Sequence, residues 1–454
     1  MKDNRSKFSS GLGFVLAASA SAVGLGNIWR FPYLAAKYGG GIFLLIYIIL
    51  VVTFGYSLMI AENSIGRMTG QSAMTAFGSL KKKWKPLGFL AILIPVIIMP
   101  YYNVIGGWVI NYMFTYLRGA HSAAAGADFF GGMLADPVRM IICAAIFTLA
   151  SAVVILRGVQ KGVEKFSIVL MPILIALAAV ISIYSIFQPG ALEGVKYFFV
   201  PNFKDFHLST LLPTILGAMG QMFYSLSLAM AIMITYGSYL SKSEDLEKNV
   251  SRIELFDTVI AILAGLMIIP AVFAFAGPDK LKSGPSLMFV VLPGVFESMG
   301  MPTFIGSLFF ILVLFAALTS SISLMEAIVS AICDYFHTNR TKTTLGVTIG
   351  SLLVSCLPIL GYNVLQNVKF FGTFDILDFM DFITNSVMMP ICALLTCIFV
   401  AYGIGLKKVD AEIEQSSPFK RKKLFHVMIK YIAPIFVIAI LVSSVLSSFG
   451  VITI

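Results

Sequence analysis

Charged residues are scarce in this sequence. Asp, Glu, Lys and Arg together make up 12% of its 454 residues, whereas soluble domains contain roughly 25%, and 58% of the residues are hydrophobic. A soluble protein of this length could not bury so much apolar surface, but a lipid bilayer accepts helices of about 20 apolar residues. The apolar runs span the whole length, so we expect one membrane domain in contact with lipid. We expect no nucleic-acid partner, despite a net charge of +10.

Histidine and cysteine are also few, which bears on catalysis. The four histidines lie in polar connections or at the end of an apolar run, and no HExxH, P-loop or paired catalytic carboxylates occur. The five cysteines show no metal-binding spacing, and their odd number within apolar stretches argues against a disulfide framework. The sequence therefore predicts a protein that is not an enzyme and has no organic cofactor.

Long apolar runs are what the sequence does contain. Residues 1–10 are too polar and too few for a cleavable signal peptide, so we expect the first run to remain as a membrane helix. Together the runs predict an all-α protein with eleven membrane spans, at about 11–36, 41–65, 87–117, 138–156, 164–187, 209–240, 253–276, 303–333, 343–360, 376–404 and 426–450.

The basic residues indicate an orientation. Of the 32 Lys and Arg residues, 22 fall on alternate connections, beginning with the N-terminal segment. By the positive-inside rule, the N-terminus lies in the cytoplasm and, after eleven spans, the C-terminus lies outside the cell membrane.

Two spans are interrupted at corresponding positions. The first is broken by Ser21–Asn27 (SAVGLGN) and the sixth by Ser225–Ala231 (SLSLAMA). Matching broken helices in two sets of five are typical of inverted-repeat transporters, whose binding site lies near the middle of the membrane. We therefore expect one transporter domain over 1–454, with repeats at about 11–187 and 209–404 and an extra helix at about 426–450.

The segment Gly24–Pro32 (GLGNIWRFP) is poorly suited to a continuous helix. In a helix interior Gly costs about 1 kcal/mol and Pro about 3 kcal/mol relative to Ala. Unwound backbone inside a membrane persists where it lines a cavity or is buried in protein. Freed carbonyls can bind sodium, and freed amides can bind a carboxylate. A kinked packing helix is the alternative, but Asn27 and Arg30 favour a site, because an ionisable residue within a span indicates function.

Several segments carry a resemblance to a known family. Ala22–Tyr33 (AVGLGNIWRFPY) and Lys37–Gly41 (KYGGG) resemble the neurotransmitter:sodium symporter family, and further matches follow in order at Glu62–Arg67 (ENSIGR), 101–103 (YYN), 220–227 (GQMFYSLS), 318–321 (LTSS) and Asp381. The resemblance implies two inverted five-helix repeats with broken helices 1 and 6. The eleven spans resemble those of bacterial amino-acid transporters in that family.

The resemblance implies two sodium sites. The first would be formed by Ala22, Asn27, Ser225 and Asp257, and the second by Ala20, Val23, Ala316, Thr319 and Ser320. Sodium is a hard cation, so oxygen ligands suit it. For the two hydroxyl residues of the second set, hydrogen bonding within their own helix or small-residue packing remains an alternative.

The resemblance also implies a substrate site. The substrate carboxylate would meet the first sodium, the amides of Leu25 and Gly26, and the Tyr102 hydroxyl. Its ammonium would meet Ala22, Tyr224, Ser225 and Ser227, and its side chain would meet Ile98, Met230, Ser320, Ser323 and Leu324. Gly24 stands where relatives that carry amines have an acidic residue, which favours an amino acid. Ala229 and Ala231 replace glycines, and because an added Cβ narrows the backbone options, the sequence leaves open how far this segment unwinds and how deep the pocket is.

Charged pairs are expected to form the gates at the outer and inner ends of the transport path. The resemblance pairs Arg30 with Asp381 at the outer end and Arg5 with Asp334 at the inner end, although Arg5 can equally be a topology charge. Asp257 stands where an Asn is usual, and we assign it as the negative charge that makes transport independent of chloride; capping of its helix is the alternative. Gly162 and Pro172 resemble a family pattern that unwinds span 5, or mark a tolerated proline.

These observations lead to one reading with two alternatives. We expect a sodium-coupled symporter, with two sodium ions, for an apolar (aliphatic or aromatic) amino acid. A sodium-linked sensor would keep the site without transport. A channel predicts a continuous polar stripe, whereas the polar residues here form isolated sites. The sequence leaves open whether the protein is a monomer or a homo-oligomer.

Overall fold

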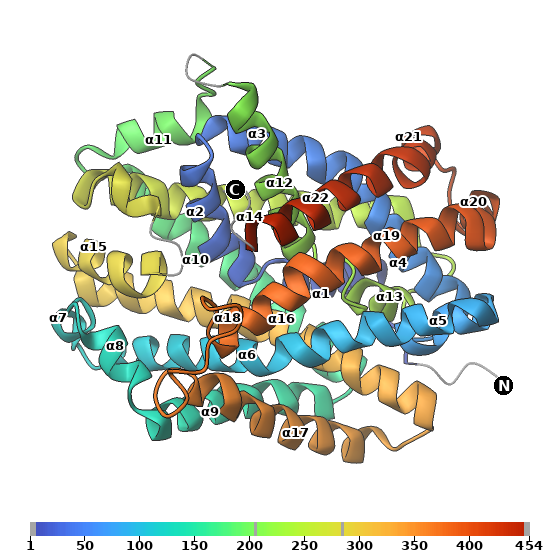
Figure 1. The fold of residues 1–454 in the computed structure, drawn as a ribbon, viewed down its shortest axis with the longest axis horizontal. Coiled ribbons are helices and arrows are strands. Elements are labelled where there is room, and N and C mark those ends of the chain that lie inside the picture. The colour runs from blue at the N-terminus through green and yellow to red at the C-terminus, as the bar shows by residue number, and fades with distance from the viewer. Residues whose placement is uncertain (1–5, 204–206, 283–285, 449–454) are drawn as a thin grey trace.

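The computed structural model describes residues 6–203, 207–282 and 286–448, and every named element in these residues is a helix (Figure 1). Pairing of the β type is limited there to two isolated bridges, Gly40 with Pro201 and Phe370 with Phe374. The expected all-α fold is confirmed for this part of the chain.

Nine stretches of the described residues form helices long and apolar enough to cross a membrane. They are Gly41–Thr69 (α3 Gly41–Leu50, η2 Val51–Gly55, α4 Tyr56–Thr69), Lys82–Leu117 (η3 Lys82–Trp84, α6 Lys85–Leu117), α9 Pro137–Leu156, Val159–Ile186 (η4 Val159–Glu164, α10 Lys165–Ile186), α14 Leu246–Phe275, α16 Pro302–Phe336, α17 Arg340–Leu360, Ile376–Ile413 (α18 Ile376–Asp381, η7 Phe382–Met388, α19 Met389–Ile398, η8 Phe399–Gly405, α20 Leu406–Ile413) and Lys422–Leu446 (α21 Lys422–Val427, η9 Met428–Ile432, α22 Ala433–Ser448).

The two interrupted spans are divided in the structure. α1 (Gly11–Ala22) is followed by η1 (Gly26–Arg30) and α2 (Phe31–Lys37), and the two parts meet at 50°. α12 (Leu208–Ser225) and α13 (Ile232–Gly237) lie where the sixth span was expected, with a six-residue break between them. The described residues thus contain nine continuous spans and one bent span by length and composition, and the count of eleven stays a prediction.

Several helices continue beyond the expected ends of the apolar runs. α14 begins at Leu246 instead of 253, because the Asp245 side chain accepts a hydrogen bond from Lys248 N at 2.9 Å and caps the helix. Short helices fill the connections: α5 Ala73–Leu80, α7 His121–Ala124, α8 Phe129–Leu134, α11 Ala191–Phe199, η5 Pro278–Lys282, η6 Leu287–Val291 and α15 Leu292–Ser298.

Helix α1 lies in the middle of the bundle (Figure 1), where it packs against α10, α14 and α16. Every residue of α1 except Leu12 is buried. In contrast, α17 and α22 carry large apolar side chains on the surface, such as Leu353 and Ile435, each 68% exposed. Such surfaces require lipid, so the chain is a multi-pass membrane protein with α1 at its core.

Candidate functional site

The break after α1 meets the break between α12 and α13. The Ser21 carbonyl accepts hydrogen bonds from Ser227 Oγ at 3.1 Å and from Ser320 Oγ of α16 at 3.0 Å. The Gly26 carbonyl accepts one from Gln221 Nε2 of α12 at 2.9 Å. Side chains from α12, the break and α16 therefore satisfy carbonyls that the interruption of α1 leaves free.

The segment between α12 and α13 is unwound despite its alanines. Ser227, Ala229 and Ala231 have φ angles of 53°, 60° and 66°, a left-handed conformation that costs a residue with a Cβ about 1–2 kcal/mol. The Ala229 amide donates to Oε1 of Glu62, a buried carboxylate of α4, at 2.7 Å. The break expected in the sixth span is therefore present at both alanines, because surrounding contacts hold the segment open.

Three of the four residues predicted for the first sodium site converge through their side chains. Asn27 Nδ2 donates to Asp257 Oδ1 at 2.8 Å, and Ser225 Oγ donates to the same oxygen at 2.7 Å. All three are fully buried, and Ala22, the fourth predicted residue, is 2% exposed. These side chains carry amide, hydroxyl and carboxylate oxygens, a donor set that fits sodium; in the structure Asn27 turns its Nδ2 to Asp257 and its Oδ1 accepts from Gly24 N at 3.4 Å. The described residues contain no cluster of three His, Cys, Asp or Glu that would suit a transition metal instead.

Tyr47 of α3 joins this cluster and was missed from the sequence. Its hydroxyl donates to Asp257 Oδ2 at 2.8 Å and lies 3.1 Å from Ser225 Oγ. Its ring packs against Phe31 and Phe43. A tyrosine within an apolar run was the available signal, because a buried phenol hydroxyl usually has a hydrogen-bond partner.

The residues predicted for the second sodium site come from α1 and α16, which pack together. Ala20, Val23, Ala316 and Thr319 are buried, and Ser320 is 9% exposed. Thr319 Oγ1 donates to the Ala316 carbonyl at 3.0 Å, which is the hydrogen bond within its own helix that the alternative interpretation expects. Ser320 instead reaches across to α1, as described above.

A cavity lies beside these two sets. Ten of the twelve predicted substrate residues line it, all except Ser225 and Ser323, and Ser21, Gly24 and Ile232 also contribute. The Ser323 hydroxyl instead donates to the Thr319 carbonyl and accepts from Tyr236. The cavity has a volume of about 30 Å³, too small for an amino acid, since ligand pockets typically measure about 300 Å³ or more. Its walls must therefore move apart to admit an amino-acid side chain.

The Tyr102 hydroxyl is notable on this wall. It is buried, and although the Ser320 side chain and the Leu25 backbone amide are close by, it makes no hydrogen bond of good geometry among the described residues. A buried polar group without a partner is costly, so this hydroxyl is suited to a polar group of a ligand in the cavity.

A second cavity adjoins the first and holds the predicted outer gate. Arg30 and Asp381 both line it, and Leu25 and Tyr224 line both cavities and so separate them. Arg30 and Asp381 make no direct ion pair in the structure. Instead Asp381 accepts a hydrogen bond from Asn385, and the Arg30 guanidinium lies 5.7 Å from the centre of the Tyr224 ring.

The predicted inner pair is seen only in part. Arg5 lies outside the described residues, and Asp334 accepts a hydrogen bond from Ser72 N at 2.7 Å. Two carboxylates that the sequence did not single out hold the start of the chain. Glu164 Oε2 accepts from Ser9 N at 2.9 Å, and Glu244 Oε1 accepts from Gly11 N, also at 2.9 Å.

A sequence model of the Sodium:neurotransmitter symporter family matches residues 5–124 and 118–451. The chain belongs to this family. The sodium-dependent transporter YhdH of Bacillus subtilis is 36% identical over 96% of each chain, and a sodium-dependent transporter of Haemophilus influenzae is 32% identical over 97% of this chain and 98% of that relative.

A solved structure of a bacterial member of the sodium:neurotransmitter symporter family agrees with this assignment. The crystal structure of MhsT in complex with L-phenylalanine is 36% identical, with a TM-score of 0.87, and the match covers 97% of this chain and 100% of that one. The relatives are transporters and not enzymes. The predicted family, the use of sodium and the absence of an enzymatic role are therefore confirmed.

Proposed function

We propose that this protein is a sodium-coupled symporter that moves an apolar amino acid into the cell by alternating access, with two sodium ions. The observation that carries the proposal is the meeting of both helix breaks at one cavity, with Asn27, Ser225 and Asp257 beside it and the Tyr102 hydroxyl on its wall. Support also comes from MhsT, a similar protein that binds L-phenylalanine.

The proposed architecture follows the broken helices. Two inverted five-helix repeats, at about 11–187 and 209–404, would each contribute one break, and an extra helix follows at about 426–450. α12 and α13 would form the remaining span, giving eleven. The end at which α1 begins would face the cytoplasm, and the C-terminus would lie outside.

In the proposed binding mode, the cavity holds the backbone of the amino acid. Its carboxylate would meet the amides of Leu25 and Gly26 and the Tyr102 hydroxyl, which lacks another partner among the described residues. Its ammonium would meet Ser227 and carbonyls of the two breaks. Ile98, Met230 and Leu324, which are apolar and line the same cavity, would surround an aliphatic or aromatic side chain.

A thermal-stability screen of the twenty amino acids, with and without sodium, tests this proposal. Ligand at 100 times its dissociation constant stabilises a protein by roughly 2.7 kcal/mol. We expect apolar amino acids to raise the melting temperature of the purified protein in sodium and to have little effect in potassium. Stabilisation by no amino acid in sodium would contradict the function.

Uptake into vesicles separates a transporter from the two alternatives. In reconstituted vesicles, an inward sodium gradient should concentrate the identified amino acid above its external level. A sensor would bind the amino acid without flux, and a channel would conduct without saturating. Either result would overturn symport.

We also propose that transport is independent of chloride, because Asp257 supplies the negative charge beside the sodium. Unpaired positive charge is costly in a site sheltered from water. Uptake by the wild type should be unchanged when gluconate replaces chloride. Asp257→Asn should impair uptake in gluconate, and chloride should restore part of it. Chloride dependence of the wild type would contradict the proposal.

A further inference from the structure

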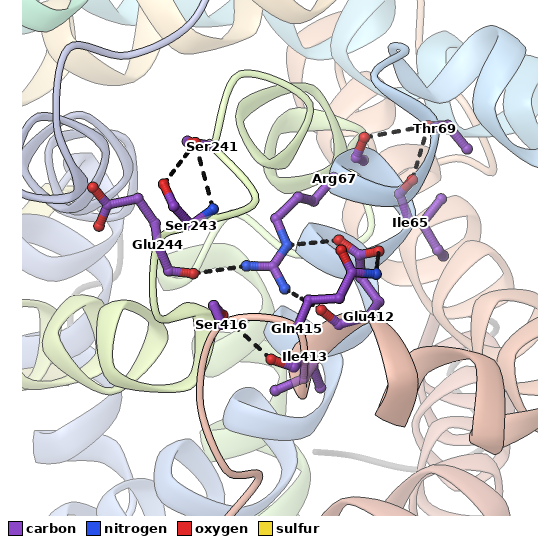
Figure 2. A network of polar contacts seen from close by, with 11 residues as sticks. Ile65, Arg67, Thr69, Ser241, Ser243, Glu244, Glu412, Ile413, Gln415 and Ser416 are labelled. Carbon is purple, nitrogen blue, oxygen red and sulfur yellow. Dashed lines mark hydrogen bonds and ion pairs between the residues drawn. The ribbon is translucent and has the colours of Figure 1, made fainter.

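A buried arginine joins three segments at the end of the bundle where α1 begins (Figure 2). Arg67, in the last turn of α4, points its guanidinium between α20 and the segment that follows α13. Its Nε donates to Glu412 Oε1 at 2.8 Å, its Nη2 donates to the Glu412 carbonyl at 2.6 Å, and its Nη1 donates to the Glu244 carbonyl at 2.8 Å. These hydrogen bonds point in different directions, so one rigid group fixes the relative positions of the two segments.

Arg67 and Glu412 form a buried ion pair, which is sensitive to the loss of either partner. The Arg67 side chain is 0% exposed and that of Glu412 is 4% exposed. A buried ion pair adds little net stability, but removal of one partner leaves an uncompensated charge and is strongly destabilising locally. Lysine cannot replace arginine here, because it lacks the planar fork that reaches two partners in fixed directions.

Glu244 connects the Arg67–Glu412 pair to the start of α1. Its carbonyl is held by Arg67, while its carboxylate accepts the Gly11 amide, which is one of the free N–H groups at the beginning of α1. The position of α1 at this end therefore depends on Glu244, and the position of Glu244 depends on Arg67.

Glu412 belongs to the connection formed by residues 406–421, which we call the strap and which is fastened at two places. Near the middle of the strap Glu412 pairs with Arg67, and Gln415 Nε2 donates to Glu412 Oε2 at 3.1 Å. At the end of the strap Glu247 of α14 accepts the Arg421 amide at 3.0 Å, and the Arg421 guanidinium lies 4.1 Å from the centre of the Tyr56 ring. The strap thus spans the ends of α4 and α14.

We propose that Arg67 is a positioning residue for transport: it couples the strap to Glu244 and thereby holds the inner end of α1 in its closed position. The proposal rests on the proposed symport function. Release of sodium and substrate into the cytoplasm requires a path past the inner end of α1, and opening that path separates Gly11 from Glu244. Weakening of the Arg67–Glu412 pair should make this separation easier and shift the protein towards the inward-open state.

Glu412→Gln tests the coupling, because it removes the charge and keeps the shape. Glu414→Gln is the matched control: it lies in the same strap, but its pair with Lys422 is exposed to solvent. Amide hydrogen exchange of residues 8–14 would be measured by mass spectrometry in sodium. It should be at least about fivefold faster in Glu412→Gln than in the wild type, because fivefold is the lower end of typical allosteric couplings. The control should match the wild type.

Sodium binding provides a second readout that a purely structural role would not change in the same way. The sodium concentration for half-maximal amino-acid binding should rise about fivefold or more in Glu412→Gln, while the number of binding sites stays constant. Saturating sodium and amino acid should restore slow exchange at residues 8–14, because both favour the closed state. Loss of binding sites with unchanged exchange at these residues would overturn the proposal.

Glu244→Gln keeps the inference testable if Glu412→Gln fails to fold. This variant retains the carbonyl that accepts from Arg67 and weakens only the contact with Gly11, so it should produce the same shifts. Unchanged exchange in a folded Glu244→Gln protein would overturn the coupling. A wild type that shows no sodium-dependent amino-acid binding would instead contradict the proposed function.

Discussion

Tyr47 shows how single residues complete the site from a distance. It comes from α3, yet its hydroxyl reaches Asp257 of α14 and lies beside Ser225 of α12. With Asn27 of η1, which also donates to Asp257, four helical segments therefore meet at one carboxylate. Several hydrogen bonds to a carboxylate favour its charged form and hold it in a fixed orientation, which is what a sodium ligand requires.

Tyr47→Phe should weaken sodium binding while the ring packing stays intact. We expect the sodium concentration for half-maximal binding to rise about tenfold, equivalent to about 1.4 kcal/mol, as measured by thermal shift against sodium. Tyr112→Phe is the control, because it removes a buried hydroxyl that donates to the Phe289 carbonyl elsewhere. Similar sodium affinities in the two variants would count against a role for Tyr47 at the site.

Ala229 and Ala231 hold backbone strain that glycine would relieve. Replacing both by glycine should stabilise the protein by about 1 kcal/mol per position, read as a higher melting temperature in the absence of ligand. Ala218→Gly should have the opposite effect, a loss of about 1 kcal/mol, because Ala218 lies inside α12. If both changes destabilise the protein, the left-handed conformation carries no strain.

At this scale, sequence reasoning found residues next to irregular backbone and missed those that act across the fold. The unusual composition of Gly24–Pro32 indicated a break, and Asn27 lies at it. Tyr47 gave only a weak local signal, a phenol within an apolar run, and Glu164 gave none, because each stands in a segment whose composition is ordinary for its position. Their partners are 210 and 155 residues away in the chain, so only the fold brings the groups together.

At the scale of elements, π-helical turns interrupt several spans. η1 lies at the break after α1, and η4 precedes α10 at the same end of the bundle as the start of α1. π-helical turns weaken the regular hydrogen-bond pattern and often occur at functional sites. In η4 this irregularity coincides with Gly162, the residue that the sequence paired with Pro172.

Pro172→Ala should slow transport and spare binding. Proline removes a backbone hydrogen bond inside α10, and alanine would restore it and resist unwinding of η4 and the first turns of α10. We expect slower uptake in vesicles with unchanged sodium-dependent amino-acid binding. Pro358→Ala in α17 is the control and should leave both unchanged. Equal loss of uptake and binding in Pro172→Ala would contradict a role in release.

Element types were predictable because apolar runs of this length are helical in a membrane, but their ends were not. α14 extends seven residues beyond the apolar run because Asp245 caps it, and α20 continues from η8 into the connection. Charged residues in these turns were assigned to loops. They remain helical because their side chains find partners at the membrane boundary, as Glu247 does with the Arg421 amide.

For the molecule as a whole, the two ends of the bundle are held differently. At one end, carboxylates bind the backbone amides at the start of α1. At the other end, Arg30 and Asp381 face a shared cavity of about 190 Å³ without a direct ion pair. One end is thus fastened by hydrogen bonds while the other lacks the ion pair expected to close it, an asymmetry that alternating access requires of each state in turn.

Closure of the outer end should bring Arg30 and Asp381 together. Arg30→Ala and Asp381→Ala should each reduce uptake at least about tenfold, about 1.4 kcal/mol, because each leaves the other charge without its partner in a sheltered cavity. Asp378→Asn, which changes another carboxylate of the same cavity, is the control and should have a smaller effect. Intact uptake in both alanine variants would show that the pair is not a gate.

The start of α1 also has a consequence for how this protein can evolve. A Cβ atom added to Gly11 would come 2.0 Å from Glu244 Oε2, and one added to Gly13 would come 1.8 Å from Glu164 Oε1. Leu12, between them, is 56% exposed. Tolerance to substitution therefore alternates along three consecutive residues. A lineage can change Leu12 freely, but a side chain at either glycine becomes acceptable only after the opposing carboxylate has been moved or replaced.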